Sequence, residues 1–332
     1  MSPEQEVSPA ASLIAETKED IDRALAGLVG EAEPPELYEP VRYVLSGGGK
    51  RLRPMLVVLT ARAFGADRSS VIPPALAVEV FHNFTLVHDD IMDRAPERRG
   101  RPTVHKEWDE GTAILVGDYL LSLSYSLLAE ARTPRINELL TVYHDMVRRL
   151  CEGQMLDAAF ERRTQVSTDE YLDMIDRKTS ALLAACFQIG GLLGDADDST
   201  VEALYGAGLD VGRAFQIRDD LLDLTADDSR WGKKRGGDLL QAKKTYLLAR
   251  AMESGDSSTR AWFADGVARG GLDESQIDEA EDRLHSMGVL DEALRSIHEY
   301  SQAALEKLSG LPENEPAGAL VELVGRLRDR LH

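Results

Sequence analysis

Residues 76–93 read LAVEVFHNFTLVHDDIMD, an apolar stretch of helical character that ends in three aspartates. With 3.6 residues per turn, Asp89 and Asp93 lie about 40° apart on one face of such a helix. Residues 215–223, FQIRDDLLD, repeat this spacing. Aspartates one turn apart repel each other unless a cation lies between them, and Mg²⁺ takes carboxylate oxygens while keeping coordination places for phosphates. One such cluster is equally typical of a solvated helix end, but two of them together predict a metal site.

The rest of the chain shows the same helical period. Apolar residues recur at helical spacing in segments of about 15–30 residues, and alternating β-branched runs bounded by tight turns are missing. Turn-forming residues separate these segments at 31–36, 65–70, 95–102, 194–199, 226–237, 254–258 and 310–318. The sequence therefore predicts an all-α protein, a single large bundle of ten or more helices around a central cavity. Residues 1–10 are predicted to be a disordered tail, and residues 11–332 a single domain.

Composition narrows the class of function. The chain has 332 residues, 43% of them hydrophobic, and carries 58 Asp and Glu against 38 Lys and Arg, a formal charge of −20. Such an excess of acid argues against nucleic-acid binding, which needs a basic surface. Cys151 and Cys186 form no CxxC or Cys/His array, so neither a disulfide nor a cysteine metal site is expected. The longest uncharged apolar stretch, 179–194, is too short to span a bilayer, and no signal segment is recognised, so we expect a soluble, cytoplasmic protein.

Cations stand beside both aspartate clusters. Residues 47–54, GGGKRLRP, join a flexible glycine run to three cations, of which Lys50 and Arg53 can share one helix face. The segment lacks the GxxxxGK[ST] spacing of a nucleotide-binding P-loop. Arg98 and Arg99 follow the first cluster, and further lysines lie before and after the second. Guanidinium groups suit phosphate oxygens, so the carboxylates and cations together predict a site for a diphosphate with magnesium.

These motifs occur in the order and spacing of a known family, and from about Tyr38 to Leu247 the sequence resembles the trans-isoprenyl diphosphate (polyprenyl) synthases. The matching segments are GGGKRLRP at 47–54, DDIMD at 89–93 with RRG at 98–100, GQMLD at 153–157, Lys178-Thr179, FQIRDDLLD at 215–223, GKKRGGD at 232–238 and KKT at 243–245. The resemblance implies the isoprenoid synthase fold, a homodimer, and a Mg²⁺-dependent prenyltransferase. Such an enzyme ionises an allylic diphosphate (dimethylallyl, geranyl or farnesyl), condenses it head-to-tail with isopentenyl diphosphate and eliminates a proton.

The resemblance also implies roles for individual residues. The metal ligands, holding three Mg²⁺ ions once substrate is bound, would be Asp89, Asp90, Asp93, Asp219, Asp220 and Asp223. The contacts to the allylic diphosphate would come from Arg98, Lys178, Lys233 and Lys243. The diphosphate of isopentenyl diphosphate would bind Lys50, Arg53, His82 and Arg99. The dipoles that stabilise the allylic cation would be those of Thr179 and Gln216, which form the catalytic set with Lys178.

Product length depends in this family on residues just before the first aspartate motif. The fourth and fifth residues before it are Thr85 and Phe84, with Phe81 another turn away. Helix geometry places Thr85 about 40° from Asp89 but Phe84 about 140° away, so the role of Phe84 rests on the resemblance alone. The context FTLVHDDIMD, without an insertion, is most similar to short-chain geranylgeranyl diphosphate (C20) synthases, with farnesyl diphosphate (C15) synthases as the alternative.

Two more distant alternatives have sequence features that weigh against them. A terpene cyclase also uses an aspartate motif and Mg²⁺, but it lacks the GGGKRLRP segment because it binds no second diphosphate. A non-catalytic partner subunit typically loses one aspartate cluster, and both clusters are intact here.

Overall fold

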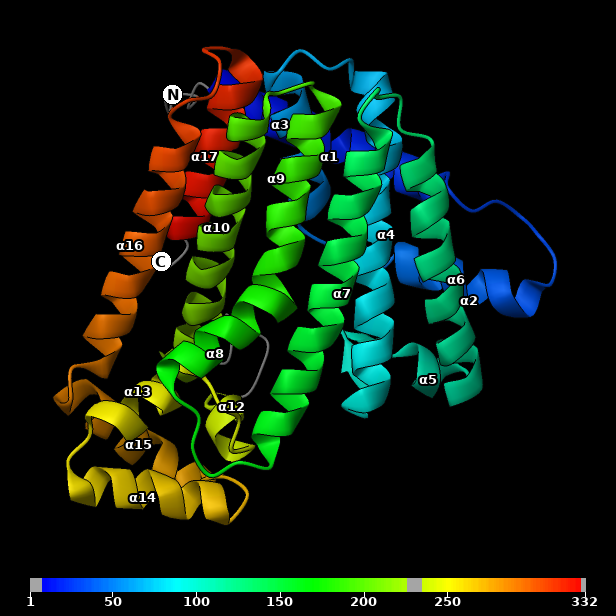
Figure 1. The fold of residues 1–332 in the computed structure, drawn as a ribbon. Coiled ribbons are helices and arrows are strands. Elements are labelled where there is room, and N and C mark those ends of the chain that lie inside the picture. The colour runs from blue at the N-terminus through cyan, green and yellow to red at the C-terminus, as the bar shows by residue number, and fades with distance from the viewer. Residues whose placement is uncertain (1–7, 226–234, 330–332) are drawn as a thin grey trace, which may run out of the picture. The chain divides into compact units, whose positions relative to one another are not determined.

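The regular structure of the chain is almost entirely helical (Figure 1). The computed structural model describes residues 8–225 and 235–329. Within these residues the strands are limited to one antiparallel hairpin, which joins β1 (Glu97–Arg98) to β2 (Arg101–Pro102). The all-α prediction is therefore confirmed.

Two compact units make up the chain, and each is described by itself. Unit 1 comprises Met1–Val142, Cys186–Glu202 and Leu311–Glu322, and unit 2 comprises Tyr143–Ala185, Ala203–Gly310 and Leu323–His332. The helices within unit 1 are α1 (Pro9–Ala26), α2 (Pro35–Leu45), α3 (Leu52–Ala63), α4 (Arg68–Met92), α5 (Val104–Glu107) and α6 (Glu110–Ala129). Residues of both units occur in α7 (Ile136–Glu161), α9 (Ala181–Leu193), α10 (Asp198–Thr225) and α17 (Glu315–Asp329). Unit 2 contains α8 (Thr168–Ile175), a π-helical turn (Asp176–Ser180), α12 (Gly237–Leu240), α13 (Tyr246–Ser254), α14 (Ser257–Ala268), a 3₁₀ turn (Glu274–Gln276), α15 (Ile277–Ser286) and α16 (Val289–Leu308). The single domain over residues 11–332 stays a prediction.

Most of the predicted disordered tail, residues 1–7, lies outside the described residues. Helix α1 begins at Pro9, so it includes residues 9 and 10 of the predicted tail. The cause is a cap: the Ser8 side chain accepts a hydrogen bond from the N–H of Ala11, which satisfies one of the donors that a helix leaves open at its start.

Helix α4 packs against most of the other helices of unit 1, most extensively against α6 and α3. Its apolar body is buried, and Phe81 has no exposed surface. The helix begins at Arg68, before the apolar stretch that predicts it, because Asp67 caps its first turn. Gly117 of α6 allows the two helices to approach closely, since a Cβ there would overlap the ring of His88 on α4. The last turn of this well-packed helix carries the first aspartate cluster.

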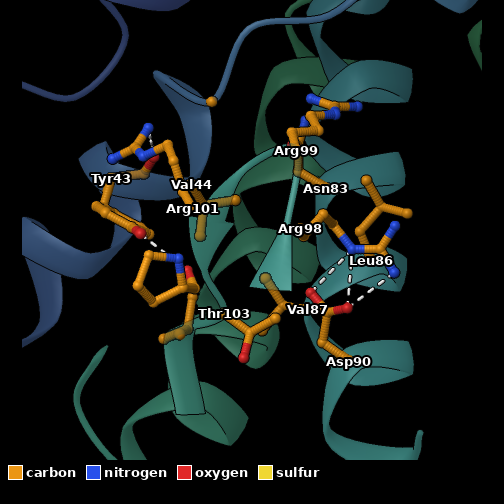
Figure 2. A pocket seen from close by; sticks show the side chains of 13 residues that line it. Tyr43, Val44, Asn83, Leu86, Val87, Asp90, Arg98, Arg99, Arg101 and Thr103 are labelled. Carbon is orange, nitrogen blue, oxygen red and sulfur yellow. Dashed lines mark hydrogen bonds and ion pairs between the residues drawn. The ribbon is translucent and has the colours of Figure 1, made fainter. Parts of the chain in front are cut away.

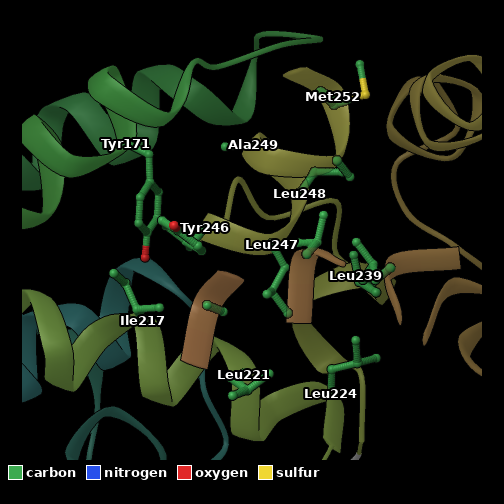
Figure 3. Close-up of a cluster of buried hydrophobic side chains, with 14 of the residues drawn as sticks. Tyr171, Ile217, Leu221, Leu224, Leu239, Tyr246, Leu247, Leu248, Ala249 and Met252 are labelled. Carbon is green, nitrogen blue, oxygen red and sulfur yellow. The ribbon is translucent and has the colours of Figure 1, made fainter. Parts of the chain in front are cut away.

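A buried apolar cluster forms the core of unit 2 (Figure 3). It combines Tyr171 of α8, Ile217 and Leu221 of α10, and Tyr246 and Leu247 of α13 with side chains of the later helices. Helices α13 and α15 pack against α16 and gather at one end of it (Figure 1). This packing fixes α8 and α13 against the stretch of α10 that carries the second aspartate cluster.

Two helices, α4 and α6, are long and apolar enough to cross a membrane when length and composition alone are considered. In their most apolar windows, 67% of α4 and 39% of α6 are buried within the protein. Such helices are weak evidence for a membrane span, because the core helix of a soluble protein passes the same test. The packing of α4 is that of a core helix, whereas α6 keeps an exposed apolar face.

Candidate active site

The first aspartate cluster lies at the C-terminal end of α4, which has Asp93 as its cap. Asp93 is exposed and Asp89 is half-buried, whereas Asp90 is turned inwards and is 5% exposed. This end of a helix is the negative pole of its dipole, so three carboxylates here require positive charge nearby. Arg98 supplies part of it: its Nε donates to both Asp90 oxygens, at 2.8 and 2.9 Å, and its Nη2 lies 2.8 Å from Asp90 Oδ1 (Figure 2).

The hairpin β1–β2 brings Arg98 and Arg99 to the end of α4. Arg98 pairs with Arg101 across the hairpin, and Arg99 turns the chain with a left-handed φ of 53°. The Tyr43 hydroxyl of α2 donates to the carbonyl of Pro102 at 2.8 Å, and the Arg101 guanidinium carbon lies 3.7 Å from the centroid of the Tyr43 ring (Figure 2). These contacts hold the hairpin against α2, beside a cavity of about 60 Å³ that Arg98 and Arg99 help to line.

The glycine run at 47–49 leads into α3 through residues with positive φ angles, a backbone conformation that few residues other than glycine adopt. Gly49 has a φ of 145°, and Arg51 follows with a φ of 51°. A left-handed backbone costs energy for arginine, so its side chain must be held firmly. It is held: Arg51 is buried, its Nε donates to Asp22 Oδ1 at 2.8 Å, and its Nη1 donates to Glu79 Oε1 at 2.7 Å. Arg51 therefore anchors the loop inside unit 1.

This anchor was missed at the level of sequence. Its one signal is Glu79, the one acidic residue in the mostly apolar stretch 76–87. A charge in such a place is expected to have a partner. Asp22 gives no signal at all, because it looks like any surface residue of an amphipathic helix.

The predicted cations of the glycine segment surround this anchor. Lys50 is exposed and Arg53 is half-buried. Arg99 of the hairpin donates a hydrogen bond to the carbonyl of Gly48, so the hairpin and the glycine run meet. Burial, and then the neighbouring charges of Arg51 and Arg98, lower the pKa of Arg99 from its usual value.

His82 lies on α4 among these arginines. The pKa of its imidazole is held well below the usual value. The main cause is burial, and the second is the positive charge of nearby arginines, namely Arg53, Arg99, Arg98 and Arg51. The ring is therefore neutral at pH 7 and can donate one N–H to an anion. Three of the four residues predicted to bind isopentenyl diphosphate thus influence one another electrostatically within unit 1.

In unit 2, Lys178 and Thr179 lie on the π-helical turn Asp176–Ser180. Turns of this kind are frequent at functional sites. The GQMLD motif begins with Gly153 of α7. Glycine is required at this position because a Cβ would overlap the backbone of Lys178. Asp157 of the same motif forms an ion pair with Lys178. The motif thus leaves room for the π-helical turn and holds its lysine.

The second aspartate cluster contacts this turn from α10. Thr179 Oγ1 donates to Gln216 Oε1 at 3.2 Å, and Gln216 Nε2 donates to Asp220 Oδ1 at 3.0 Å. Asp220 is 3% exposed, and its Oδ2 also accepts from the Tyr171 hydroxyl at 2.5 Å and from the Tyr246 N–H at 2.9 Å. Burial is the main reason that the pKa of Asp220 rises to about 7.

The other two aspartates of this cluster differ in exposure. Asp219 keeps 32% of its side chain exposed, with one oxygen 3.8 Å from Arg218 Nη2. Asp223 is buried, and its Oδ2 accepts a hydrogen bond from the N–H of Asp238 at 2.9 Å. The cluster therefore presents Asp219 outwards and uses Asp223 to order the start of α12.

A cavity of about 90 Å³ lies among these groups of unit 2. The predicted site residues that line it are Lys178, Thr179, Gln216, Asp220 and Lys243. Lys243 Nζ donates to Asp238 Oδ1 at 3.1 Å, and although burial would lower the pKa of this lysine, the carboxylates of Asp238 and Asp220 raise it. Lys233, the remaining predicted cation, lies outside the described residues.

Magnesium fits these carboxylates as an ion shared with a ligand. Among residues 8–225 and 235–329, no three His, Cys, Asp or Glu side chains enclose a metal site by themselves. Mg²⁺ is usually held by one or two carboxylates together with substrate phosphates and water. Asp93, Asp89 and Asp219 offer partly or fully exposed carboxylates of this kind. The donor set therefore suits magnesium that binds together with a phosphate.

Three comparisons with known proteins, by family model, by sequence and by structure, agree on one family. The polyprenyl synthetase family model matches residues 34–284. A geranylfarnesyl diphosphate synthase of Natronomonas pharaonis is 38% identical, over 96% of this chain and 97% of its own length. A geranylgeranyl diphosphate synthase of Methanosarcina mazei is 39% identical, over 93% of this chain and 94% of its own. The crystal structure of geranylgeranyl pyrophosphate synthetase from Pyrococcus horikoshii Ot3 matches with a TM-score of 0.90 at 38% identity, covering 96% of this chain and 98% of that one.

Proposed function

The chain belongs to the polyprenyl synthetase family, and within it we propose that this enzyme makes geranylgeranyl diphosphate (C20). Its all-α architecture is the isoprenoid synthase fold of that family. Enzymes of the family are Mg²⁺-dependent prenyltransferases that use isopentenyl diphosphate and an allylic diphosphate. In the proposed reaction the allylic substrate (dimethylallyl, geranyl or farnesyl diphosphate) loses its diphosphate. The double bond of isopentenyl diphosphate then attacks the cation, and a proton is lost.

The observation that supports a synthase with two diphosphate substrates is that unit 1 holds two chemically different groups of charged side chains, the cations around His82 and the aspartates at the end of α4. One diphosphate keeps its bond to carbon, and fixed cations suffice to bind it. Lys50, Arg53 and Arg99, together with the neutral His82, are proposed to be these fixed groups. The other diphosphate leaves and gains charge, for which the aspartate-rich end of α4 with bound metal is suited. A terpene cyclase needs only the second kind of site.

The residues of unit 2 are proposed to act on the reacting carbon. The Thr179 hydroxyl and the Gln216 carbonyl offer dipoles that stabilise an allylic cation without attacking it. Lys178 and Lys243 are proposed to bind oxygens of the departing diphosphate. Magnesium, of which we propose three ions in the loaded enzyme, supplies Lewis-acid stabilisation of that leaving group. For these ions Asp89, Asp93 and Asp219 are the proposed ligands.

The geometry of α4 supports a product of intermediate length. The rings of Phe81 and Phe84 lie 5.4 Å apart, and that of Phe84 lies 4.8 Å from His88, so bulky aromatic groups follow one side of the helix. Thr85 is smaller, 8% exposed, and donates its hydroxyl to the carbonyl of His82 at 2.8 Å. We propose that this mixture of bulky and small side chains stops growth at C20, with C15 as the alternative.

We also propose that the enzyme is a cytoplasmic homodimer. Ile114 and Leu115 of α6 are 43% and 63% exposed, an apolar pair on a helix that is only partly covered by its own chain. Burial of such side chains against a second copy is favourable. A dimer contact therefore accounts for the apolar character of α6 without a membrane.

The test is product analysis of the purified protein. It is incubated with Mg²⁺, isopentenyl diphosphate and, separately, the C5, C10 and C15 allylic diphosphates, and the products are identified by mass spectrometry. We expect elongation of all three primers with C20 as the dominant product. Dominant C15 from the C5 primer would overturn the C20 assignment, whereas a hydrocarbon product would indicate a cyclase. No elongation of any primer would refute the proposed function.

A further inference from the structure

Asp220, the second aspartate of its motif, accepts hydrogen bonds from other groups of the protein at both of its carboxylate oxygens. Tyr171 and the backbone of Tyr246 both donate to its Oδ2, at 2.5 and 2.9 Å, and Gln216 donates to its Oδ1 at 3.0 Å. The group is 3% exposed. A carboxylate whose two oxygens accept three hydrogen bonds in a buried place is held in one orientation. Figure 3 shows the Tyr171 ring reaching from α8 towards the part of α10 that carries Ile217, with its hydroxyl leading.

The fixed carboxylate of Asp220 determines how the side-chain amide of Gln216 is oriented. An amide has a donor end and an acceptor end, and in the structure both oxygens of Asp220 act as acceptors, Oδ2 from Tyr171 and Tyr246 and Oδ1 from Gln216. Asp220 therefore requires the NH₂ end, which leaves the Gln216 carbonyl oxygen directed to the Thr179 hydroxyl at 3.2 Å, on the lining of the cavity. Turning the amide over would place its oxygen against the Asp220 carboxylate and lose that hydrogen bond, whereas the Thr179 hydroxyl could accept from the NH₂ group instead. The orientation of the Gln216 dipole thus depends on Asp220, and that of Asp220 depends on Tyr171.

On the premise of the proposed function, we propose that Tyr171 and Asp220 are positioning residues that hold the Gln216 carbonyl towards the allylic cation. Tyr171 also lines the cavity, but its hydroxyl is directed to Asp220. Its hydroxyl fixes the Asp220 carboxylate, and the carboxylate fixes the amide. In this arrangement Asp220 acts through Gln216, and the metal is left to Asp219 beside it.

The chain offers a matched control in Tyr246. Its ring centroid lies 6.2 Å from that of Tyr171, in the same buried cluster. Its hydroxyl, however, bonds to Ser296 at 2.9 Å, and only its backbone N–H reaches Asp220. Tyr246→Phe therefore removes a hydroxyl from the same core and leaves the carboxylate with all three donors. Any general effect of losing a buried tyrosine hydroxyl appears in both variants.

The experiment compares wild type, Tyr171→Phe and Tyr246→Phe in the full-length enzyme. The measurements are kcat, KM for both diphosphates, the Mg²⁺ concentration at half-maximal rate, and the melting temperature. Loss of a group that orients the ligands of a metal commonly costs about 10- to 100-fold in activity, and a group that orients a dipole near the reacting carbon is expected to matter to a similar degree. We expect that loss in kcat for Tyr171→Phe, with KM and the Mg²⁺ requirement changed less than about twofold. Tyr246→Phe is expected to keep kcat within about twofold of wild type.

A second variant keeps the outcome decisive if Tyr171→Phe does not fold. Asp220→Asn preserves shape but offers an NH₂ group to Gln216, so the amide can turn and withdraw its oxygen from the cavity. We expect a kcat loss at an unchanged Mg²⁺ requirement. A raised Mg²⁺ requirement, with kcat restored at high Mg²⁺, would identify Asp220 as a metal ligand and refute the positioning role. Equal kcat in Tyr171→Phe and Tyr246→Phe would refute it as well.

These outcomes stay separate from failure of the proposed function. An inactive wild type with every allylic primer would refute the synthase itself. An active wild type whose Tyr171→Phe variant behaves like Tyr246→Phe would leave the synthase standing and remove only the positioning role.

Discussion

Replacing Glu79 with glutamine tests the buried network that anchors the glycine segment. The Arg51 and Glu79 side chains are each only 4% exposed, and Nη1 lies 2.7 Å from Oε1. Removing one partner of a buried ion pair leaves the other charge uncompensated and costs about 3–5 kcal/mol. Asp22 stays bonded to Nε at 2.8 Å, and glutamine can still accept one hydrogen bond. We therefore expect the lower end, a loss of about 3 kcal/mol in the free energy of unfolding.

The assay is urea unfolding followed by circular dichroism, with Asp22→Asn as the matched control. The Asp22 side chain is 39% exposed, so water replaces much of its interaction and its loss should cost at most about 1 kcal/mol. A destabilisation by Glu79→Gln no larger than that of Asp22→Asn would show that the buried pair does not carry the network.

Stability and positioning can then be separated with an apolar pair. The double variant Arg51→Met with Glu79→Leu removes both charges, and such replacements are often neutral or stabilising. We expect its free energy of unfolding to return to within about 1 kcal/mol of wild type. Its KM for isopentenyl diphosphate should nevertheless rise by about tenfold, because nothing then fixes the left-handed backbone beside Lys50. A stable double variant with an unchanged KM would refute a positioning role for Arg51.

Further expectations concern single groups of the two units. Asp89→Ala should lower kcat by about 1,000-fold without lowering the melting temperature, because it removes a metal ligand but relieves crowding of like charges; wild-type kcat would contradict the metal role. Gly153→Ala should cost about 1–3 kcal/mol in urea unfolding and reduce kcat, because its methyl group overlaps the backbone at Lys178; Gly325→Ala, which meets open space, serves as its control. Because the folded protein keeps the pKa of His82 well below 6.5, the unfolded chain binds more protons as the pH falls below about 6.5, and the free energy of unfolding decreases there. His82→Gln should flatten that decrease between about pH 7 and pH 5, and equal slopes in the two proteins would contradict a depressed pKa. Leu115→Glu should convert the proposed dimer to a monomer in light scattering, and a dimer of unchanged affinity would place the interface elsewhere.

The sequence was sufficient for the fold class and for the motifs, because both depend on local spacing. Helical period and the absence of strand patterns predict an all-α chain, and the place of Asp89 and Asp93 on one helix end follows from 3.6 residues per turn. Where a helix boundary differs from the prediction, a capping residue explains the difference. Helix α4 starts at Arg68 because Asp67 caps it, although the apolar pattern begins later.

Interactions between distant residues could not be predicted in this way. Arg51 looks like one more cation of a phosphate-binding segment, and only the folded chain brings Glu79, 28 residues away, against it. The π-helical turn at Lys178 has no sequence signature of its own. Gly153 marks the close approach that accommodates it, but a glycine inside a helix can also serve packing elsewhere. The motifs therefore indicated the candidate ligand-binding residues better than the residues that hold them in place.

The two aspartate clusters nevertheless follow one rule, which the helix itself imposes. The second aspartate of each motif is turned about 100° from the first, away from the face that the first shares with the fifth. In unit 1 that residue is Asp90, which Arg98 Nε engages at both oxygens; in unit 2 it is Asp220, which Tyr171 engages. Both are nearly fully buried, whereas the first aspartates, Asp89 and Asp219, keep accessible surface. A buried carboxylate without a partner would be costly, so each second aspartate needs its own protein donor. The middle of each DDxxD motif thus ties its helix to the surroundings, while the first position keeps an accessible carboxylate for the proposed metal.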